Sequence, residues 1–331
     1  MSRLSEFNRI STSLVALGDE VLYPLSQQAR YLSPRTALLT LEGHPVFIKR
    51  IALTEREWRL VSTKPTNNLF NLPMCLHYGV GSRGFGAWRE WRCHQLATEW
   101  VLSGQCKQFP LLYDWRIFPR LSDDFLFDDS VRDAEWEVWG KDPYYGVRLD
   151  ELQCAPAELV LFLEYIPARL SDYKEHLSTL FEKLMPVCDF MEQQGFIHFD
   201  AHFENILTDG HDVFFSDFGL SLSTSFDLAQ DEREFFIKHK PFDRYFIILN
   251  MLHALSNPRF LSERAWVNLQ DKIPDQQRVK SAQWQRWIEA YWPLGICLDE
   301  FYQQMYRGRI HTLYPGDRLA QLYERAGQVG K

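Results

Sequence analysis

Residues 195–221 read GFIHFDAHFENILTDGHDVFFSDFGLS, and this stretch decides which fold the chain is expected to have. His198 and Asp200 stand near its beginning, and Asn205 follows five residues after the aspartate. Two short apolar runs joined by an Asp-Gly turn come next, which predicts a β-hairpin. The second run leads directly to Asp217. We therefore expect the hairpin to return Asp217 to the loop that carries Asp200 and Asn205.

This set of side chains matches what phosphoryl transfer from ATP requires. An aspartate has to orient the attacking hydroxyl and accept its proton, and oxygen ligands have to hold the metal ion that neutralises the phosphates. Mg²⁺ is bound by few protein oxygens, and water and phosphate oxygens complete its octahedron. Two carboxylates and one amide, brought together by a loop and a hairpin, meet this need.

The pattern H-x-D-x-x-x-x-N followed by D-F-G resembles the catalytic and metal-binding loops of protein kinases. The resemblance implies that Asp200 is the catalytic base and that His198 is a scaffold for its loop. It also implies that Asn205 and Asp217 bind Mg²⁺, or Mn²⁺ in its place. It covers roughly residues 30–255 and is nearest to bacterial and viral kinase-like proteins with a long insert before the hinge.

The resemblance also predicts the fold class, which is α+β with two lobes. A small β-rich N-lobe, residues 1–166, is expected to hold the ATP-binding strands, one helix and an acidic insert at about 121–150. A larger helical C-lobe, residues 167–331, is expected to hold the catalytic and metal-binding loops. Clefts between such units are common ligand sites. By the resemblance, ATP is the expected cofactor.

The amino-terminal half offers a phosphate-binding lysine. Residues 36–51 predict a β-hairpin, and the second strand ends in V-F-I-K at Lys49. By the resemblance Lys49 contacts the α- and β-phosphates and pairs with a helix glutamate. Residues 87–103 predict that helix, with Glu90 and Glu99 as candidates. Glu90 shares an apolar stripe with three further residues of the helix, so we choose it; these are His94, Ala97 and Val101.

Residues 159–166, LVLFLEYI, predict a buried strand that ends at a hinge. Glu164, Tyr165 and Ile166 resemble the hinge whose backbone receives adenine. A glycine-rich loop is missing between the first two strands, where the turn that contains Arg35 is the candidate phosphate contact. A G-x-G-x-x-G-x-G pattern occurs instead at residues 79–86, after the lysine strand. It is either a phosphate contact or a flexible connector.

The remaining segments give coarser expectations. Residues 109–115 predict a short strand, and residues 171–195 predict one long helix. From Asp243 onward the chain is expected to be helical, with breaks at 257–258, 293 and 315–316. Asp243 itself either braces the catalytic loop or caps a helix. The acidic insert, which contains Trp136 and Trp139, predicts a solvated face, with a docking surface for a basic partner as the alternative.

Composition limits the partners and the compartment. The 331 residues carry a net charge of −8 and have a pI near 5.7, which gives no general attraction to nucleic acid or to an anionic membrane. The apolar stretches are too short to span a membrane. The six cysteines form no C-x-x-C pair, so we expect buried, reduced thiols. Together these features predict a cytoplasmic protein, with delivery to another cell left open.

The acceptor is a hydroxyl, either on Ser or Thr of a protein or on a small molecule of the aminoglycoside or choline type. His202 stands where serine/threonine kinases usually carry lysine and small-molecule kinases commonly carry histidine. D-F-G and Asp243 are more typical of protein kinases, so a protein acceptor is favoured. A pseudokinase is the third hypothesis, but the lysine, both aspartates and the asparagine are all present. Phe199, where many kinases have a phosphate-binding arginine, predicts activity without phosphorylation.

Overall fold

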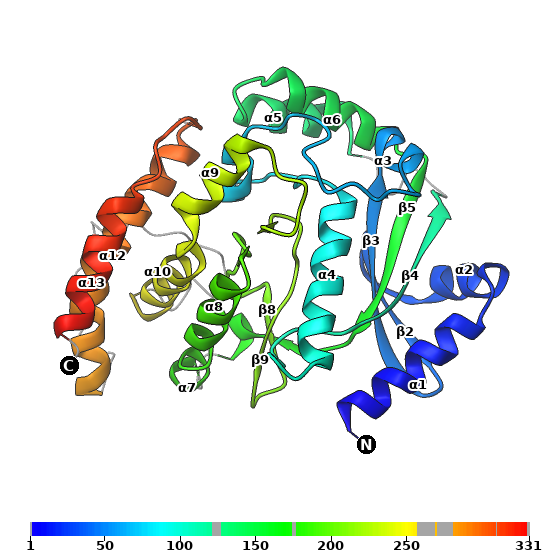
Figure 1. Cartoon of the computed structure of the whole chain (residues 1–331), viewed down its shortest axis with the longest axis horizontal. Helices are drawn as coiled ribbons and strands as arrows, with labels where there is room; N and C mark the ends of the chain where they lie inside the picture. Colours follow the sequence, from blue (N-terminus) through cyan, green and yellow to red (C-terminus); the bar gives the residue numbers. More distant parts are fainter. Residues whose placement is uncertain are drawn as a thin grey trace.

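The computed structural model describes residues 2–120, 127–173, 177–256, 269, 281–308 and 310–329. The strands of the amino-terminal part are longer than those that follow them, and the carboxy-terminal part is mainly helical (Figure 1). In the first part the elements are α1 (Arg3–Ala16), α2 (Asp19–Gln28), β1 (Arg30–Ser33), β2 (Thr36–Leu41), β3 (His44–Leu53), α3 (Glu55–Arg59), η1 (Met74–Tyr78), α4 (Ala87–Leu102), β4 (Leu112–Pro119), α5 (Asp129–Val138), α6 (Pro143–Gln153) and β5 (Ala157–Glu164).

These strands form one five-stranded antiparallel sheet in the order β1-β2-β3-β5-β4. The predicted hairpin is confirmed as β2 and β3. Glu42 and Gly43 make its two-residue turn with φ values of 50° and 77°, the left-handed conformation that such tight turns require. Lys49 lies on β3, the central strand, opposite Thr36 on one side and Leu161 on the other.

Helices cover both faces of the sheet. On one face, apolar residues of α1 and α2 pack against the sheet; they include Ile10, Leu14 and Leu22, which contact Val46, Ile48, Val160 and Phe162. On the other face, Trp88 of α4 packs against Leu159, Leu161 and Leu163. Because side chains alternate along a strand, the two faces receive alternate residues of β3 and β5. Lys49 belongs to the face that α4 covers, since it contacts Glu90 of that helix.

The second part of the chain supplies short strands and the main helical core. Its elements are β6 (Ala168–Arg169), η3 (Leu170–Asp172), α7 (Leu177–Phe181), α8 (Leu184–Gln193), β7 (Phe196–Ile197), β8 (Ile206–Thr208), β9 (Val213–Phe215), β10 (Leu222–Ser223), α9 (Gln230–His239), α10 (Phe242–Ser256), α12 (Ala282–Tyr306) and α13 (Gly316–Val329). The predicted second hairpin is confirmed as β8 and β9, which pair antiparallel. Within the described residues no helix is both long and apolar enough to cross a membrane.

Several expected boundaries are wrong. The single helix over 171–195 is instead η3, α7 and α8, and α8 restarts so that Pro186 falls in its first turn, where a missing N–H does little harm. Pro293 does not break the chain but lies inside α12, whose buried residues on both sides hold the helix together. The strand expected at 109–115 is β4, Leu112–Pro119. The break at 315–316 is confirmed, and 257–258 lies outside the described residues.

The cysteine prediction holds in part. All six cysteines are free, and four are buried, as expected. Cys154 is exposed instead, because it is the residue that ends α6 at the surface. A free thiol at this position is open to solvent reagents, whereas burial protects the others.

Candidate active site

The loop between β7 and β8 carries Asp200 and is fixed by a buried carboxylate. Asp243, at the start of α10, accepts hydrogen bonds from the backbone N–H groups of His198 (2.7 Å) and Phe199 (2.9 Å). Phe199 has a φ of 64°, a conformation that costs free energy for a residue with a side chain. The two bonds to Asp243 hold the backbone in this turn. Asp243 was expected either to brace the loop or to cap a helix. Its two hydrogen bonds to the loop backbone correspond to the first of these roles.

Asn205 fixes the orientation of Asp200. Its amide nitrogen donates to Oδ2 of Asp200 at 2.9 Å and to the backbone oxygen of Asp200 at 3.1 Å. The backbone N–H and the hydroxyl of Ser216 both donate to the carbonyl oxygen of Asn205. Oδ2 of Asp200 is thereby held by Asn205. The other carboxylate oxygen, Oδ1, lies 3.6 Å from His202 Nε2.

His198 links the two loops. Its Nδ1 accepts from the backbone N–H of Asp200 (3.3 Å), and its Nε2 contacts the carbonyl oxygen of Ser216 (2.9 Å). The first contact makes Nδ1 an acceptor, so Nε2 carries the proton of a neutral ring. Burial lowers the pKa of His198 to about 4, in agreement with that state. His198 thus ties the Asp200 loop to the residue that precedes Asp217.

Lys49 joins the sheet to the second loop. Its Nζ lies 2.8 Å from Oδ1 of Asp217 and 2.5 Å from Oε1 of Glu90. Burial opposes ionisation of Asp217, but the charge of Lys49 and its hydrogen bond hold the pKa of Asp217 below its ordinary value. The side chain of Asp217 is 48% exposed, so one face of this carboxylate remains open to a ligand. Asp217 has a φ of 64°, so it is a second residue of the site, after Phe199, with a strained left-handed backbone.

The choice between the two helix glutamates follows the predicted stripe. Glu90 is buried beside Lys49, whereas Glu99 is exposed and pairs with Arg92 at 3.1 Å. His94, one turn after Glu90, is buried against the ring of Phe218 with 4.8 Å between ring centroids. α4 therefore meets both Lys49 and the Asp-Phe-Gly segment through one face.

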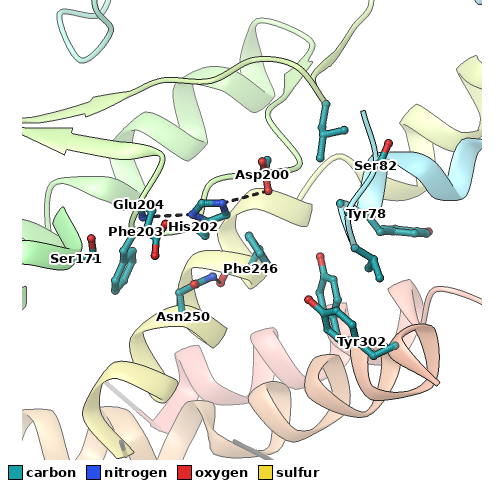
Figure 2. A pocket seen from close by; sticks show the side chains of 15 residues that line it. Tyr78, Ser82, Ser171, Asp200, His202, Phe203, Glu204, Phe246, Asn250 and Tyr302 are labelled. Atoms are coloured by element: carbon teal, nitrogen blue, oxygen red, sulfur yellow. Dashed lines mark hydrogen bonds and ion pairs between the residues drawn. The ribbon is translucent and has the colours of Figure 1, made fainter. Parts of the chain in front are cut away.

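Three neighbouring cavities meet at these residues. The hinge pocket, about 500 Å³, is lined by Lys49, Asn205 and Asp217 and by apolar side chains; those are Leu32, Phe47, Leu163, Ile166 and Leu207. The central cavity, about 350 Å³, is lined by Arg35, Lys49, Glu90, Asp200 and Asp217 among others. The tyrosine pocket, about 530 Å³, is lined by Asp200, His202 and Tyr78, Tyr302 and Tyr306 (Figure 2). Asp200 borders two of the three.

The hinge candidates lie at the first of these cavities. Glu164, Tyr165 and Ile166 all line the hinge pocket. The carboxylate of Glu164 is already engaged, because Arg3 Nε contacts its Oε1 at 2.8 Å and the backbone N–H of Leu111 donates to its Oε2 at 3.0 Å. Its side chain is therefore not free to bind a ligand, and only the backbone of this segment can do so.

Residues 79–86 lie against the loops that carry Asp200 and Gly219. A Cβ built on Gly84 would stand 2.3 Å from the carbonyl oxygen of Gly219, so no side chain fits at this contact. A Cβ on Gly79 would lie 3.7 Å from Oδ1 of Asp200. Two hydrogen bonds also tie this segment to residues 129–153. Arg148 Nε donates to the carbonyl oxygen of Gly84 at 3.0 Å, and Arg83 Nε donates to Glu135 at 2.8 Å. A loose connector would not have these contacts.

The acidic insert supplies those contacts through α5 and α6 (Figure 1). Asp133 and Glu137 are exposed, as expected for a solvated face. Glu135 instead points inward to Arg83, and Trp139 is buried. This inward side was not predicted, because no local pattern tells which acidic residue of the helix meets a distant arginine.

The donor atoms available for a metal ion are few. Among the described residues no group of three or more His, Cys, Asp or Glu side chains could hold a metal. Asn205 and Asp217 both line the hinge pocket and offer one amide oxygen and one half-exposed carboxylate. A pair of oxygens suits Mg²⁺ bound together with phosphate, and it does not suit a metal held by the protein alone.

Comparison with known proteins returns nothing that bears on the site. No protein-family model matches the chain, and no curated protein matches it. The chemistry of this site therefore has to be argued from its geometry.

Proposed function

We propose that the chain is an ATP-dependent phosphotransferase with a two-lobed, protein-kinase-like fold, which moves the γ-phosphate of Mg-ATP to a hydroxyl. The observation that carries the proposal is the contact of Lys49 with both Glu90 and Asp217, next to the loop that holds Asp200. These residues come from a strand, a helix and two loops separated by up to 168 positions. Their convergence is what phosphoryl transfer needs.

The nucleotide fits the hinge pocket. Its apolar walls, which include Phe47 and Leu207, suit a purine ring, and the backbone of Tyr165 and Ile166 can bond the ring edge. The phosphates would then pass Lys49 and reach the central cavity. Arg35, in the turn between β1 and β2, also lines that cavity and adds a second positive charge.

Asn205 and Asp217 would hold Mg²⁺ against the phosphates. A magnesium ion held there would supply positive charge next to the β- and γ-phosphates. Lys49 keeps Asp217 ionised and so ready to bind a cation. Glu90 positions Lys49 from the other side, and the strained backbone of Asp217 fixes the direction of its carboxylate.

Asp200 would act on the acceptor. The hydroxyl oxygen attacks the γ-phosphorus, the bond from that phosphorus to the bridging oxygen of ADP breaks, and the hydroxyl proton passes to Asp200 Oδ1. Oδ2 is held by Asn205, so the carboxylate cannot rotate away from the substrate. Positioning and charge neutralisation then account for most of the rate.

The direct test follows the γ-phosphate. The protein is incubated with Mg²⁺ and ATP labelled at the γ-position, together with a pool of proteins or a pool of metabolites, and both ADP and the label are measured. We expect ADP to form and the label to enter one pool, and both to be lost in Asp200→Ala. A folded wild-type protein that binds no Mg-ATP and forms no ADP contradicts the proposal.

A further inference from the structure

The tyrosine pocket lies where an acceptor has to bind. It is bordered by Asp200 and shares only Glu204 with the hinge pocket. The central cavity connects the two, since it shares Lys49 and Asp217 with the hinge pocket and Asp200 with the tyrosine pocket. A phosphate that leaves the hinge pocket through the central cavity therefore meets a molecule bound in the tyrosine pocket.

The walls of this pocket come from six parts of the chain that converge around Asp200, and two of these parts contribute one residue each, Ser171 and Leu220. Figure 2 shows Tyr78 and Ser82 on one side and His202 and Glu204 on the other. Residues of α10 and α12 complete the walls; they are Phe246, Asn250, Tyr302 and Tyr306. A polypeptide needs a groove that lets its chain pass on both sides of the reacting side chain. A pocket of about 530 Å³ with walls from six segments suits a compact molecule instead.

Two polar side chains that are almost fully buried line this pocket, and each has an oxygen with no hydrogen bond to another described residue. Asn250 is 1% exposed, and its amide nitrogen donates to the carbonyl oxygen of Phe246 at 2.8 Å. No residue in the described part of the chain donates to its Oδ1. Ser171, 5% exposed, likewise bonds only through its backbone N–H, to Phe203. Neither oxygen is among the described polar atoms that are shut off from solvent. Both are therefore open to the pocket and can bond to a ligand there.

The side chains that line the pocket indicate which chemical groups the ligand carries. The lining offers acceptors, such as the Oδ1 of Asn250, and hydroxyl groups that both donate and accept, such as those of Ser82 and Ser171. A ligand that complements both kinds of group has to donate and accept hydrogen bonds itself. Phe203, Phe246 and Tyr302 offer aromatic rings on which the C–H face of a saturated ring can pack. Hydroxyl groups spaced around a small ring satisfy both demands.

We propose that the acceptor is a small polyol, about the size of one or two sugar rings, bound in the tyrosine pocket by Asn250 and Ser171 with one hydroxyl directed at Asp200. This inference rests on the proposed function and names its substrate class. It selects the small-molecule alternative over the protein acceptor that the sequence favoured.

The test compares acceptors first. Wild-type protein with Mg²⁺ and γ-labelled ATP is given neutral monosaccharides and cyclitols, an amino sugar, or casein as a polypeptide, and the rates of ADP formation and label transfer are measured. We expect one or more polyols or amino sugars to accelerate ADP formation and to carry the label. Label in casein alone, or ATP turnover that no member of the polyol panel accelerates, overturns the inference and leaves the phosphotransferase proposal standing. No ATP turnover at all counts against the phosphotransferase itself.

Two variants then test the pocket with the best acceptor. Asn250→Leu removes the unpaired oxygen, and Ser171→Ala, a smaller change, serves where the first fails to fold. Each should raise the KM for the acceptor about tenfold and leave the KM for ATP unchanged, as expected for the loss of one buried hydrogen bond. Asn8→Leu, on the exposed side of α1, is the matched control and should change neither value. Unchanged acceptor KM in both pocket variants would refute the assignment of this pocket.

Discussion

Lys49 is the single cation that contacts both Glu90 and Asp217 among the described residues, and its removal should affect catalysis more than folding. We predict that Lys49→Met lowers kcat at least a hundredfold, because the phosphates lose their positioning charge and the two carboxylates then repel each other. Steady-state kinetics and thermal unfolding measure the two effects. Lys107→Met is the matched control, since Lys107 forms a surface pair with Asp212. Equal losses in both variants would contradict a specific role.

Substitutions of Asp200 and Asp217 should have different effects on turnover and on the binding of Mg-ATP. Asp200 does not line the hinge pocket, so Asp200→Asn should lower kcat by a factor of about 10² to 10⁴ and leave the affinity for Mg-ATP unchanged. Asp217→Asn should weaken Mg-ATP binding as well, because Asp217 lines that pocket. Calorimetric titration with Mg-ATP separates the two outcomes. Asp209→Asn, in the β8–β9 turn, should behave as wild type.

His202 should act through Asp200. Its Nδ1 accepts from the backbone N–H of Glu204, which leaves Nε2 directed at Asp200 Oδ1, 3.6 Å away (Figure 2). We predict that His202→Ala lowers turnover and that His202→Lys retains most of it, because a lysine keeps a donor near the carboxylate. Comparing pH profiles of turnover checks this: the lysine variant should lose any limb that depends on the histidine. Equal profiles in all three proteins would mean that the ring only packs the loop.

At this scale the sequence predicted the members of the site but not all of their contacts. The spacing of Asp200, Asn205 and Asp217 and the helical stripe that contains Glu90 predicted which residues would meet, because each follows from local geometry. Glu164 lines the hinge pocket, but the salt bridge that occupies its side chain depends on Arg3, 161 positions away. No local pattern carries such information.

Among the elements, α4 is fixed in the position that brings Glu90 to Lys49. Glu57 accepts from the backbone N–H of Ala87 at the start of α4 (2.7 Å), and Arg89 forms a buried salt bridge with Glu232 of α9. Breaking such a buried pair is costly, so α4 is not expected to swing away from the sheet.

We therefore predict that activity does not depend on phosphorylation of the segment after Asp-Phe-Gly. Ser221 and Ser223 are buried, and Phe199 offers no charge to a phosphate on the exposed Thr224 or Ser225. Protein treated with phosphatase should turn over ATP at the same rate as untreated protein, with mass spectrometry to verify the loss of phosphate. A collapse of activity on dephosphorylation would show that the inference is wrong.

The insert should act as a clamp on residues 79–86. Arg148→Ala removes the bond to the carbonyl oxygen of Gly84, so this segment can lift from Gly219. We predict a drop in kcat of about tenfold with an unchanged KM for ATP, since Arg148 does not line the hinge pocket. Arg132→Ala is the matched control, because Arg132 pairs with exposed carboxylates of the same insert. A loss of equal size in the control would contradict the clamp.

How well each element could be predicted depends on where its signal comes from. The β2–β3 and β8–β9 hairpins have turn residues and apolar runs in the local sequence, and both were predicted. The course of the chain at Pro186 and Pro293 depends on packing against distant helices. Local rules suggested an unbroken helix at the first proline and a break at the second, and both expectations were wrong.

For the whole molecule, four buried neutral histidines predict sensitivity to acid. Burial lowers the pKa of His94 to about 3, of His198 and His239 to about 4, and of His77 well below its ordinary value. Unfolded histidines titrate near 6.5, so the unfolded state binds more protons as the pH falls from about 6.5 to 4, and stability is lost over this range. Burial raises the pKa of Asp243 to about 7, which works in the opposite direction.

Burial also raises the pKa of Glu90 and Glu158, which adds to the effect of Asp243. The net difference is therefore at most about three protons, which corresponds to a loss of at most about 4 kcal/mol of unfolding free energy per pH unit. Urea unfolding at a series of pH values between 7.5 and 5 measures this slope. His94→Leu should reduce it by about 1.4 kcal/mol per pH unit, and His211→Leu, in the exposed β8–β9 turn, should not. A flat profile would contradict the neutral, buried state of these rings.

The salt bridge between Arg3 and Glu164 has a practical consequence for anyone who purifies this protein. The first turn of α1 holds the carboxylate at the mouth of the hinge pocket, and the same guanidinium donates to the backbone oxygens of Lys107 and Phe109. An affinity tag that crowds residue 3, or a protease that clips the first few residues, would free this carboxylate and put a negative charge beside the nucleotide. If the hinge pocket binds ATP as proposed, samples handled in this way would bind it more weakly, and a tag at the other end of the chain avoids the artefact.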